Sequence, residues 1–263
     1  MESNYNAVDA EGYERLMGKI AAKLSAAFMD FTGHPPGQKI LDVGCGTGML
    51  TFALAARGDH AEIAGIDLAE PYVDYARRHN TDPRLSFGIA DATSLPFPDA
   101  SFDRAYSQLV IQFLTDPFPA VTEMRRVVRP GGMVAATLWD GYGGQPHLRM
   151  LWDTASALGF DPSRSLFRPL DGEGEMAEMW RRAGLTEVKQ DMITIRIGFD
   201  NFADYWTPFL SGDAPAGELV AGLTPEQRAV LEKQVRHVFL SGRPDGPRSF
   251  VISAWICRGI VPA

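Results

Sequence analysis

Cysteine, positive charge and long apolar runs are all scarce in this chain of 263 residues. Its two cysteines, Cys45 and Cys257, have no metal-ligand spacing between them. No apolar run approaches the roughly 20 residues that cross a bilayer, and the polar, acidic N-terminus does not have the form of a signal peptide. We therefore expect a cytoplasmic protein that binds no metal and does not enter a membrane.

The charge balance is acidic, with a formal net charge of −8 at pH 7. An acidic surface repels phosphate backbones, which argues against a nucleic-acid partner. The densest basic cluster, Arg125, Arg126 and Arg129, falls on a predicted helix and its end, where a solvated face explains it. These features favour a globular protein without a nucleic-acid partner.

Strand and helix patterns alternate over the first half of the chain. Five short apolar runs predict strands, at residues 39–43, 61–66, 85–89, 102–107 and 133–138. Helical patterns separate these runs, and a longer amphipathic helix over about 11–31 precedes them. Alternation of this kind predicts a parallel sheet with right-handed crossovers.

The pattern loosens after residue 138. A helix near 175–183 and two further strands at about 186–197 and 249–258 are predicted, and residues 199–248 read as helical. Within them, Thr224 has the form of a helix cap. We expect one domain over 1–263, with a sheet core at about 38–140, 174–198 and 249–260. The expected covering segments are 1–37, 141–173 and 199–248.

The most informative segment is the turn after the first strand, Ile40-Leu-Asp-Val-Gly-Cys-Gly-Thr-Gly48. Its glycines let the backbone approach a ligand closely. A dinucleotide-binding turn has the pattern G-x-G-x-x-G, and Met49 stands where the last glycine would be. Asp42, two residues before the first glycine, would repel a pyrophosphate and attract a ligand that carries an ammonium and a sulfonium.

Two further acids follow the next two strands. Asp67 ends the second strand, about 20 residues beyond the turn, where an acid binds ribose hydroxyls in Rossmann-like folds. Asp91 follows the third strand, where its carboxylate can accept a hydrogen bond from the exocyclic amine of adenine. The carboxyl ends of neighbouring parallel strands share one edge of the sheet. These acids therefore predict a site for a nucleoside that carries an amino acid.

These segments resemble the class I S-adenosylmethionine-dependent methyltransferases, in the group that includes ubiquinone/menaquinone-biosynthesis C-methyltransferases. The similarity covers about residues 38–140, in LDVGCGTG (41–48), GIDLAEPYVDYARR (65–78), GIADATSLPFPDASFD (88–103) and MRRVVRPGGMVAATLWD (124–140). It implies a Rossmann-like α/β fold with a mostly parallel seven-stranded sheet, an antiparallel last strand, flanking helices and an added helical lid. It also implies S-adenosylmethionine as methyl donor and S-adenosylhomocysteine as product.

The resemblance further implies which residues hold the cofactor. The expected cofactor-binding residues run from the methionine end through the ribose to the adenine, and the last two follow the fourth strand. They are Asp42, Gly44, Cys45, Gly46, Asp67, Leu68, Asp91, Ala92, Ser107 and Gln108. Two positions depart from the family pattern. Ala69 stands where serine is common, and Gln112 stands where related enzymes often carry histidine, which weakens the case for a general base there.

The methyl group of a sulfonium is already activated, so transfer needs alignment more than acid–base chemistry. We assign no catalytic residue on this ground, and His147 and Gln112 are only weak candidates for one. The acceptor pocket is expected under the covering segments, whose aromatic content favours an uncharged, fairly apolar small molecule. Its expected lining residues are Tyr13, Met17, Gln112, Trp139, Tyr142, Tyr205 and Trp206.

Two other functions stay open at this point. One is a binding module, such as a sensor or a partner subunit, that holds S-adenosylmethionine without catalysis. The other is an NAD-linked oxidoreductase, which Asp42 and Met49 disfavour. The sequence leaves open which acceptor atom would be methylated, and it does not decide between a monomer and a homodimer.

Overall fold

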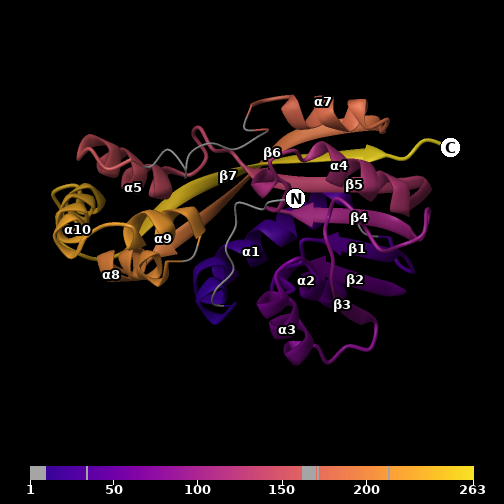
Figure 1. Cartoon of the computed structure of the whole chain (residues 1–263), viewed down its shortest axis with the longest axis horizontal. Helices are drawn as coiled ribbons and strands as arrows, with labels where there is room; N and C mark the ends of the chain where they lie inside the picture. The colour runs from indigo at the N-terminus through magenta and orange to yellow at the C-terminus, as the bar shows by residue number, and fades with distance from the viewer. Residues whose placement is uncertain (1–9, 34, 162–169, 171, 213) are drawn as a thin grey trace.

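The computed structural model describes residues 10–33, 35–161, 170, 172–212 and 214–263. Figure 1 shows a twisted sheet flanked by helices, with a smaller helical lobe at one end. The strands are β1 (Lys39–Val43), β2 (Glu62–Asp67), β3 (Leu85–Ile89), β4 (Phe102–Gln108), β5 (Val128–Trp139), β6 (Thr186–Phe199) and β7 (Arg248–Ile260).

These strands form one seven-stranded sheet in the order β3-β2-β1-β4-β5-β7-β6. The strands β1 to β5 pair in parallel, and β7 runs antiparallel to both β5 and β6. The predicted mostly parallel sheet with an antiparallel last strand is thereby confirmed. The chain order reverses at β1, which lies between β2 and β4, and ligands of such sheets bind beyond the strand ends at this point.

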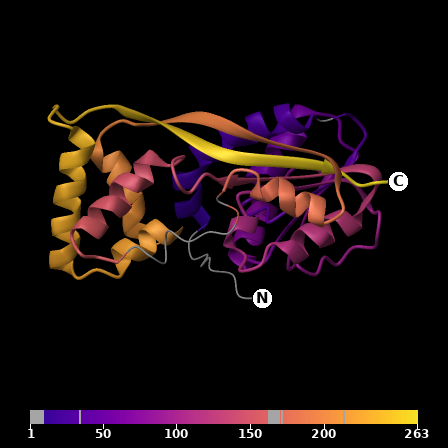
Figure 2. The ribbon, with the colours of Figure 1, turned by 90° about the horizontal axis from the view of Figure 1, so that it is seen from above.

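Different helices cover the two faces of the sheet, as the view from above in Figure 2 also shows. They are α1 (Ala10–Thr32), α2 (Met49–Arg57), α3 (Glu70–His79), α4 (Phe118–Val127) and α7 (Glu175–Arg182). Side chains alternate along each strand. Accordingly Ile40 packs with residues of α1 and α2, and its neighbour Leu41 packs with residues of α4 and α7.

The lobe lies beside the C-terminal end of β6 and the N-terminal end of β7 (Figures 1 and 2). It consists of α5 (Pro146–Ala157), α8 (Phe202–Trp206), the short 3-10 helix η2 (Thr207–Ser211), α9 (Ala214–Ala221) and α10 (Pro225–Leu240). Its hydrophobic cluster, which includes Leu151, Tyr205 and Phe239, is distinct from the two clusters of the sheet. The helical addition to the sheet therefore has a core of its own.

Two elements differ from the sequence prediction. The helix α5 was not predicted, because the glycines just before it hid the spacing of its buried residues Leu151 and Ala155. The strand β5 begins at Val128 and not at Met133, because Val128 already pairs with Phe102 before the register shifts between Phe102 and Arg104. By contrast, Thr224 caps α10 in a capping box, as predicted.

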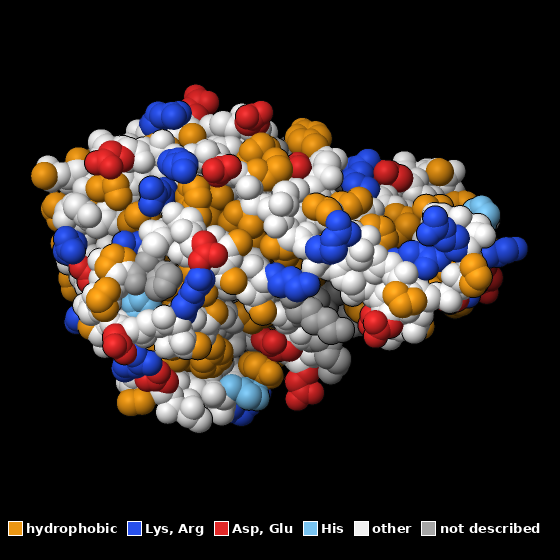
Figure 3. All heavy atoms as spheres, turned by 180° about the vertical axis from the view of Figure 1, so that it is seen from behind, with side chains coloured by type: hydrophobic (Ala, Val, Ile, Leu, Met, Phe, Trp, Pro, Cys, Tyr) orange, Lys and Arg blue, Asp and Glu red, His pale blue; other side chains and the backbone are white. Residues whose placement is uncertain are grey.

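On the face seen in Figure 3, acidic and basic side chains are interspersed. Within the described part of the chain, every helix is too short or too polar to cross a bilayer.

Candidate functional site

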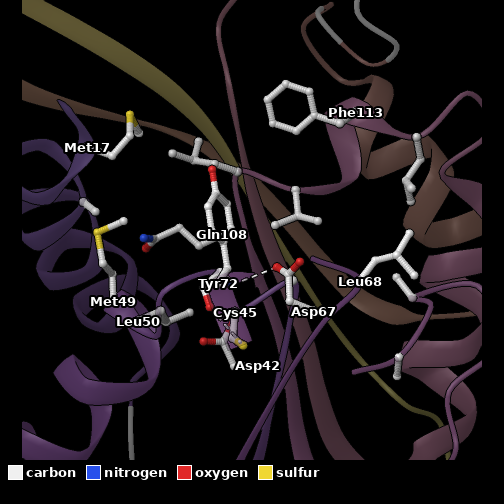
Figure 4. A pocket seen from close by; sticks show the side chains of 18 of the residues that line it. Met17, Asp42, Cys45, Met49, Leu50, Asp67, Leu68, Tyr72, Gln108 and Phe113 are labelled. Atoms are coloured by element: carbon white, nitrogen blue, oxygen red, sulfur yellow. Dashed lines mark hydrogen bonds between the residues drawn. The ribbon is translucent and has the colours of Figure 1, made fainter. Parts of the chain in front are cut away.

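A cavity lies beyond the carboxyl ends of β1, β2 and β4, with α1 and the loop after β4 at its rim (Figure 4). In this view Met17 and Met49 lie on one side, Leu68 and Phe113 on the other, and Asp67 between them. The lining residues are Met17, Ala21, Asp42, Gly44, Cys45, Gly46, Met49, Leu50, Asp67, Leu68, Tyr72, Ala90, Asp91, Ala92, Gln108, Leu109, Val110, Phe113 and Leu114.

The structure brings together every residue predicted to bind the cofactor, with one exception. Ser107 is fully buried in β4 and does not line the cavity. Several lining residues were not predicted from the sequence, and Tyr72 is the most informative of them. Tyr72 is buried in the first turn of α3, five residues after Asp67. That spacing could have identified it, because the helix after a parallel strand begins at the same edge of the sheet.

The glycine turn is held close to β2 and to the loop after β4. The backbone N–H groups of Gly44 and Cys45 both donate to the carbonyl oxygen of Ile66, at 2.7 and 2.8 Å. Gly44 has a φ of 75°, and a Cβ atom there would lie 2.4 Å from the side chain of Val110. Only glycine fits both the backbone conformation and this contact.

We expect Gly44→Ala to cost more stability than Gly37→Ala. Gly37 has a similar φ of 72°, but a Cβ atom there would meet nothing within 4 Å. The control variant therefore carries only the backbone strain of about 1–2 kcal/mol, and Gly44→Ala adds roughly 1–3 kcal/mol of overpacking. The free energies of unfolding, from denaturant titration of both variants, test this. Equal losses would show that Val110 moves aside at no cost.

Asp67 closes the far end of the turn. Its Oδ2 accepts a hydrogen bond from the Gly46 backbone N–H at 2.8 Å, and its Oδ1 accepts one from the Ala69 N–H at 2.8 Å. Burial raises the pKa of this carboxyl, and hydrogen bonds from the backbone of Ala69, Gly46 and Leu68 act against that shift. Asp67 therefore fixes the glycine turn to the start of α3 and leaves its remaining lone pairs available to a ligand in the cavity.

Asp42 is 1% exposed at the floor of the cavity. The Thr51 hydroxyl donates to its Oδ2 at 2.7 Å, and its Oδ1 has no hydrogen-bond partner among the described residues. Burial raises the pKa of Asp42 to about 7. The sequence prediction treated Asp42 as fully charged, whereas the structure makes it a carboxyl that titrates near neutral pH until a cation lies beside it.

Asp91 has the opposite character. Its Oδ1 accepts hydrogen bonds from the backbone N–H and the hydroxyl of Thr93, both at 2.8 Å. The backbone hydrogen bond from Thr93 lowers the pKa of Asp91. The carboxylate that follows β3 is therefore ionised at neutral pH and can accept a hydrogen bond from a ligand amine.

The loop after β4 forms the remaining wall. Leu109 has a φ of 63°, which is uncommon for a residue other than glycine. Its backbone N–H donates to the carbonyl oxygen of Thr137 at 2.9 Å, which holds the loop against β5. Such strained positions persist where the surroundings fix them and are frequent at functional sites.

Among the residues predicted to bind the acceptor whose side chains the structure describes, only Met17 lines this cavity. Gln112 and Trp139 are buried outside it, where the Gln112 Oε1 accepts a hydrogen bond from the Trp139 backbone N–H at 2.8 Å. Tyr205 and Trp206 belong to the core of the lobe. Tyr142 is 79% exposed on the loop after β5. The side chain of Tyr13 lies outside the described residues.

His147 also lies away from the cavity. Its ring is packed 6.3 Å from that of Phe199 and 6.4 Å from that of Phe250, and the Tyr205 hydroxyl donates to its backbone carbonyl at 2.8 Å. Burial lowers the pKa of His147 to about 4. The structure thus places this weak catalytic candidate as a neutral imidazole between the lobe and the strands.

This burial predicts a loss of stability in acid. Unfolding exposes His147 and restores its ordinary pKa of 6.5. The contribution of the neutral imidazole to the free energy of unfolding is therefore complete above pH 6.5 and is lost as the pH falls towards 4. We expect a loss of about 3 kcal/mol in the free energy of unfolding over that window, and this part should be absent in His147→Phe. Denaturant titration at several pH values measures it. An acid profile that is unchanged in His147→Phe would contradict the burial of a neutral imidazole.

Among the described residues, no group of three or more histidine, cysteine, aspartate or glutamate side chains is placed to hold a metal ion. The polar groups of the cavity are carboxyls, amides and hydroxyls with the Cys45 thiol, whose pKa burial raises well above its ordinary value. The arrangement suits a ligand that combines positive charge, hydroxyl groups and a flat apolar ring.

Comparison with known proteins agrees with this geometry. A family model described as a methyltransferase domain matches residues 41–136. The malonyl-[acyl-carrier protein] O-methyltransferase of Hahella chejuensis is 36% identical over 151 residues, which are 53% of this chain and 54% of that protein. The chain spans about half the length of the curated relatives it matches.

Two solved structures share the fold. A protein of Bacillus halodurans described as a methyltransferase has a TM-score of 0.61 at 17% identity, over 91% of this chain and 99% of that one. The phosphoethanolamine N-methyltransferase 2 of Haemonchus contortus, solved with phosphomonomethylethanolamine and S-adenosylhomocysteine, has a TM-score of 0.59 at 16% identity, over 98% of this chain and 61% of that one. Residues 41–136 thus match a methyltransferase domain, and the sheet order and the glycine turn of the chain resemble those of the class I S-adenosylmethionine-dependent methyltransferases.

Proposed function

We propose that this protein binds S-adenosylmethionine in the cavity at the ends of β1, β2 and β4 and transfers its methyl group in line to a small molecule. The observation that carries the proposal is the convergence of three acids on one cavity behind the glycine turn, Asp42, Asp67 and Asp91. They come from the ends of the neighbouring strands β1, β2 and β3, and each has a different environment.

The residues present fit such a cofactor. The unpartnered Oδ1 of Asp42 is a buried acceptor that suits a cationic group of the methionine end. We assign the ribose hydroxyls to Asp67 and the adenine amine to Asp91, with Leu68 and Ala92 beside the ring. The bound cofactor supplies an activated methyl group. The protein's part is to orient the two reactants and to exclude water, which can contribute roughly 7–11 kcal/mol.

We propose a neutral and largely apolar acceptor. Met17 and Met49 line the side of the cavity opposite Leu68 (Figure 4), and the apolar side chains of Ala21 and Val110 also line the cavity. The carboxylates of the cavity would repel an acceptor that carries a negative charge at short range. Apolar walls with few polar groups favour a ligand that is recognised mainly by its shape and its buried apolar area.

Calorimetry with S-adenosylmethionine, S-adenosylhomocysteine and NAD tests the cofactor assignment. We expect both S-adenosyl ligands to bind and NAD to give no heat, because Asp42 lies where a pyrophosphate would approach. Binding of NAD in preference to both would contradict the assignment and favour the oxidoreductase alternative.

Formation of S-adenosylhomocysteine from S-adenosylmethionine in the presence of an acceptor then tests catalysis. The acceptor panel contains neutral aromatic hydroxyl compounds, matched carboxylic acids and malonyl-acyl carrier protein, which the name of the Hahella relative suggests. We expect product with the neutral compounds. Turnover of the carrier protein alone would contradict the proposed acceptor class. Tight cofactor binding without product from any acceptor would favour the non-catalytic binding module.

A further inference from the structure

The covering helix α1 presents a stripe of small and apolar side chains to the cavity. Met17 and Ala21 line the cavity, and Ser25 follows one turn later on the same face of the helix. Ser25 is fully buried. It is a polar residue on an apolar stripe, so the contact that its hydroxyl makes needs an explanation.

That contact is Gln108, which lies at the end of β4 and lines the cavity. The Ser25 Oγ lies 3.0 Å from the Gln108 Nε2 and 3.1 Å from its Oε1, so the hydroxyl can accept from the amide nitrogen or donate to the amide oxygen. The pair joins residues 83 positions apart in the chain. It is a direct polar link between the covering helix and a residue at the wall of the cavity.

The other end of α1 is held separately. The Arg104 Nη1 donates to the backbone carbonyls of Thr32 and Gly33, both at 2.8 Å, and the Phe28 ring packs edge-on against Tyr106 at 5.0 Å. These contacts fix the last turns of the helix to the sheet. Ser25 lies between this anchored end and the part of α1 that faces the cavity.

We propose that Ser25 is a positioning residue that acts through Gln108 to hold α1 over the bound cofactor. Met17 and Ala21 then form a fixed wall between the cofactor and solvent. The inference rests on the proposed function, because the cofactor is the ligand whose release α1 would slow. Its consequence is kinetic: loss of the hydroxyl should speed dissociation of the cofactor, because α1 is then held less firmly over the cavity.

The test measures dissociation of S-adenosylhomocysteine from the full-length protein by stopped-flow displacement. We expect Ser25→Ala to release the ligand about three- to tenfold faster, as loss of one buried hydrogen bond implies. Thr32→Val is the matched control. Thr32 is also buried in α1, but its hydroxyl donates to the Phe28 carbonyl within the same helix at 3.0 Å. This variant should release the ligand at the native rate.

A double-mutant cycle separates positioning from a general weakening of the helix. If Ser25 acts through Gln108, Ser25→Ala should add no further acceleration in a Gln108→Leu background. Hydrogen exchange gives a second readout: S-adenosylhomocysteine should protect the amides of α1 in the native protein and protect them less in Ser25→Ala.

Native release from Ser25→Ala, or equal acceleration in both backgrounds, would overturn the positioning role while leaving the proposed function intact. Failure of the native protein to bind S-adenosylhomocysteine at all would overturn both. An acceleration by Thr32→Val as large as that by Ser25→Ala would also overturn it, because the effect would then follow from helix stability alone.

Discussion

Asp67→Ala is expected to weaken S-adenosylmethionine binding about tenfold or more. Each hydrogen bond to a charged group contributes about 1.5–3 kcal/mol, and the variant removes those that a ribose would make. It also removes the acceptor for the Gly46 and Ala69 N–H groups, each 2.8 Å from the carboxylate, so the turn itself loses support. Calorimetry of the native and variant proteins measures the change in affinity.

Asp82→Ala supplies the control for this prediction. Asp82 lies between α3 and β3 and also accepts a backbone hydrogen bond, from the Arg84 N–H at 2.9 Å, but it does not line the cavity. Its replacement should change stability without changing cofactor affinity. Native affinity in Asp67→Ala would show that Asp67 does not bind the cofactor. Asp67→Asn retains one acceptor oxygen, so its affinity should lie between those of the native protein and of Asp67→Ala.

Asp42→Asn should raise the stability of the ligand-free protein and weaken cofactor binding. The folded pKa of Asp42 is about 7 and its ordinary value is 3.8, so the native protein loses stability as the pH rises from 3.8 to 7. The loss amounts to about 4 kcal/mol once the carboxyl is ionised. Asparagine cannot ionise and keeps an acceptor for the Thr51 hydroxyl. At pH 8 the ligand-free variant should therefore be more stable than the native protein, which denaturant titration measures.

The same substitution should weaken binding of the cationic cofactor about tenfold or more, because a buried charge loses its partner. In the native protein, affinity should rise between pH 6 and pH 8 as Asp42 ionises, and binding near pH 7 should release a proton. Calorimetry in two buffers of different ionisation enthalpy measures that proton. A native affinity that is flat with pH, or full binding by Asp42→Asn, would contradict the electrostatic role.

Comparing the two ligands locates the partner of Asp42. S-adenosylhomocysteine keeps the ammonium of the methionine end and lacks the sulfonium charge. If Asp42 lies nearest the sulfonium, Asp42→Asn should weaken S-adenosylmethionine binding much more than S-adenosylhomocysteine binding. If it pairs with the ammonium, both ligands should lose affinity equally.

The sequence by itself determined the sheet and most of the residues that meet at the cavity. Strand and helix patterns identified all seven strands, and nine predicted residues, from Asp42 to Gln108, line one cavity. This was possible because the parallel topology brings strand ends to a common edge, so that position along the chain predicts position at the site. The glycines and acids are also local signals that need no knowledge of distant contacts.

Burial and long-range contacts were decided only by the tertiary structure. The same aromatic composition that predicted an acceptor pocket instead gave the lobe its core, where Tyr205 packs and His147 is held neutral. The link from Ser25 to Gln108 and the near-neutral pKa of Asp42 likewise arise from elements that meet only in the folded chain. Sequence spacing places a side chain at an edge or on a face, but desolvation depends on everything packed around it.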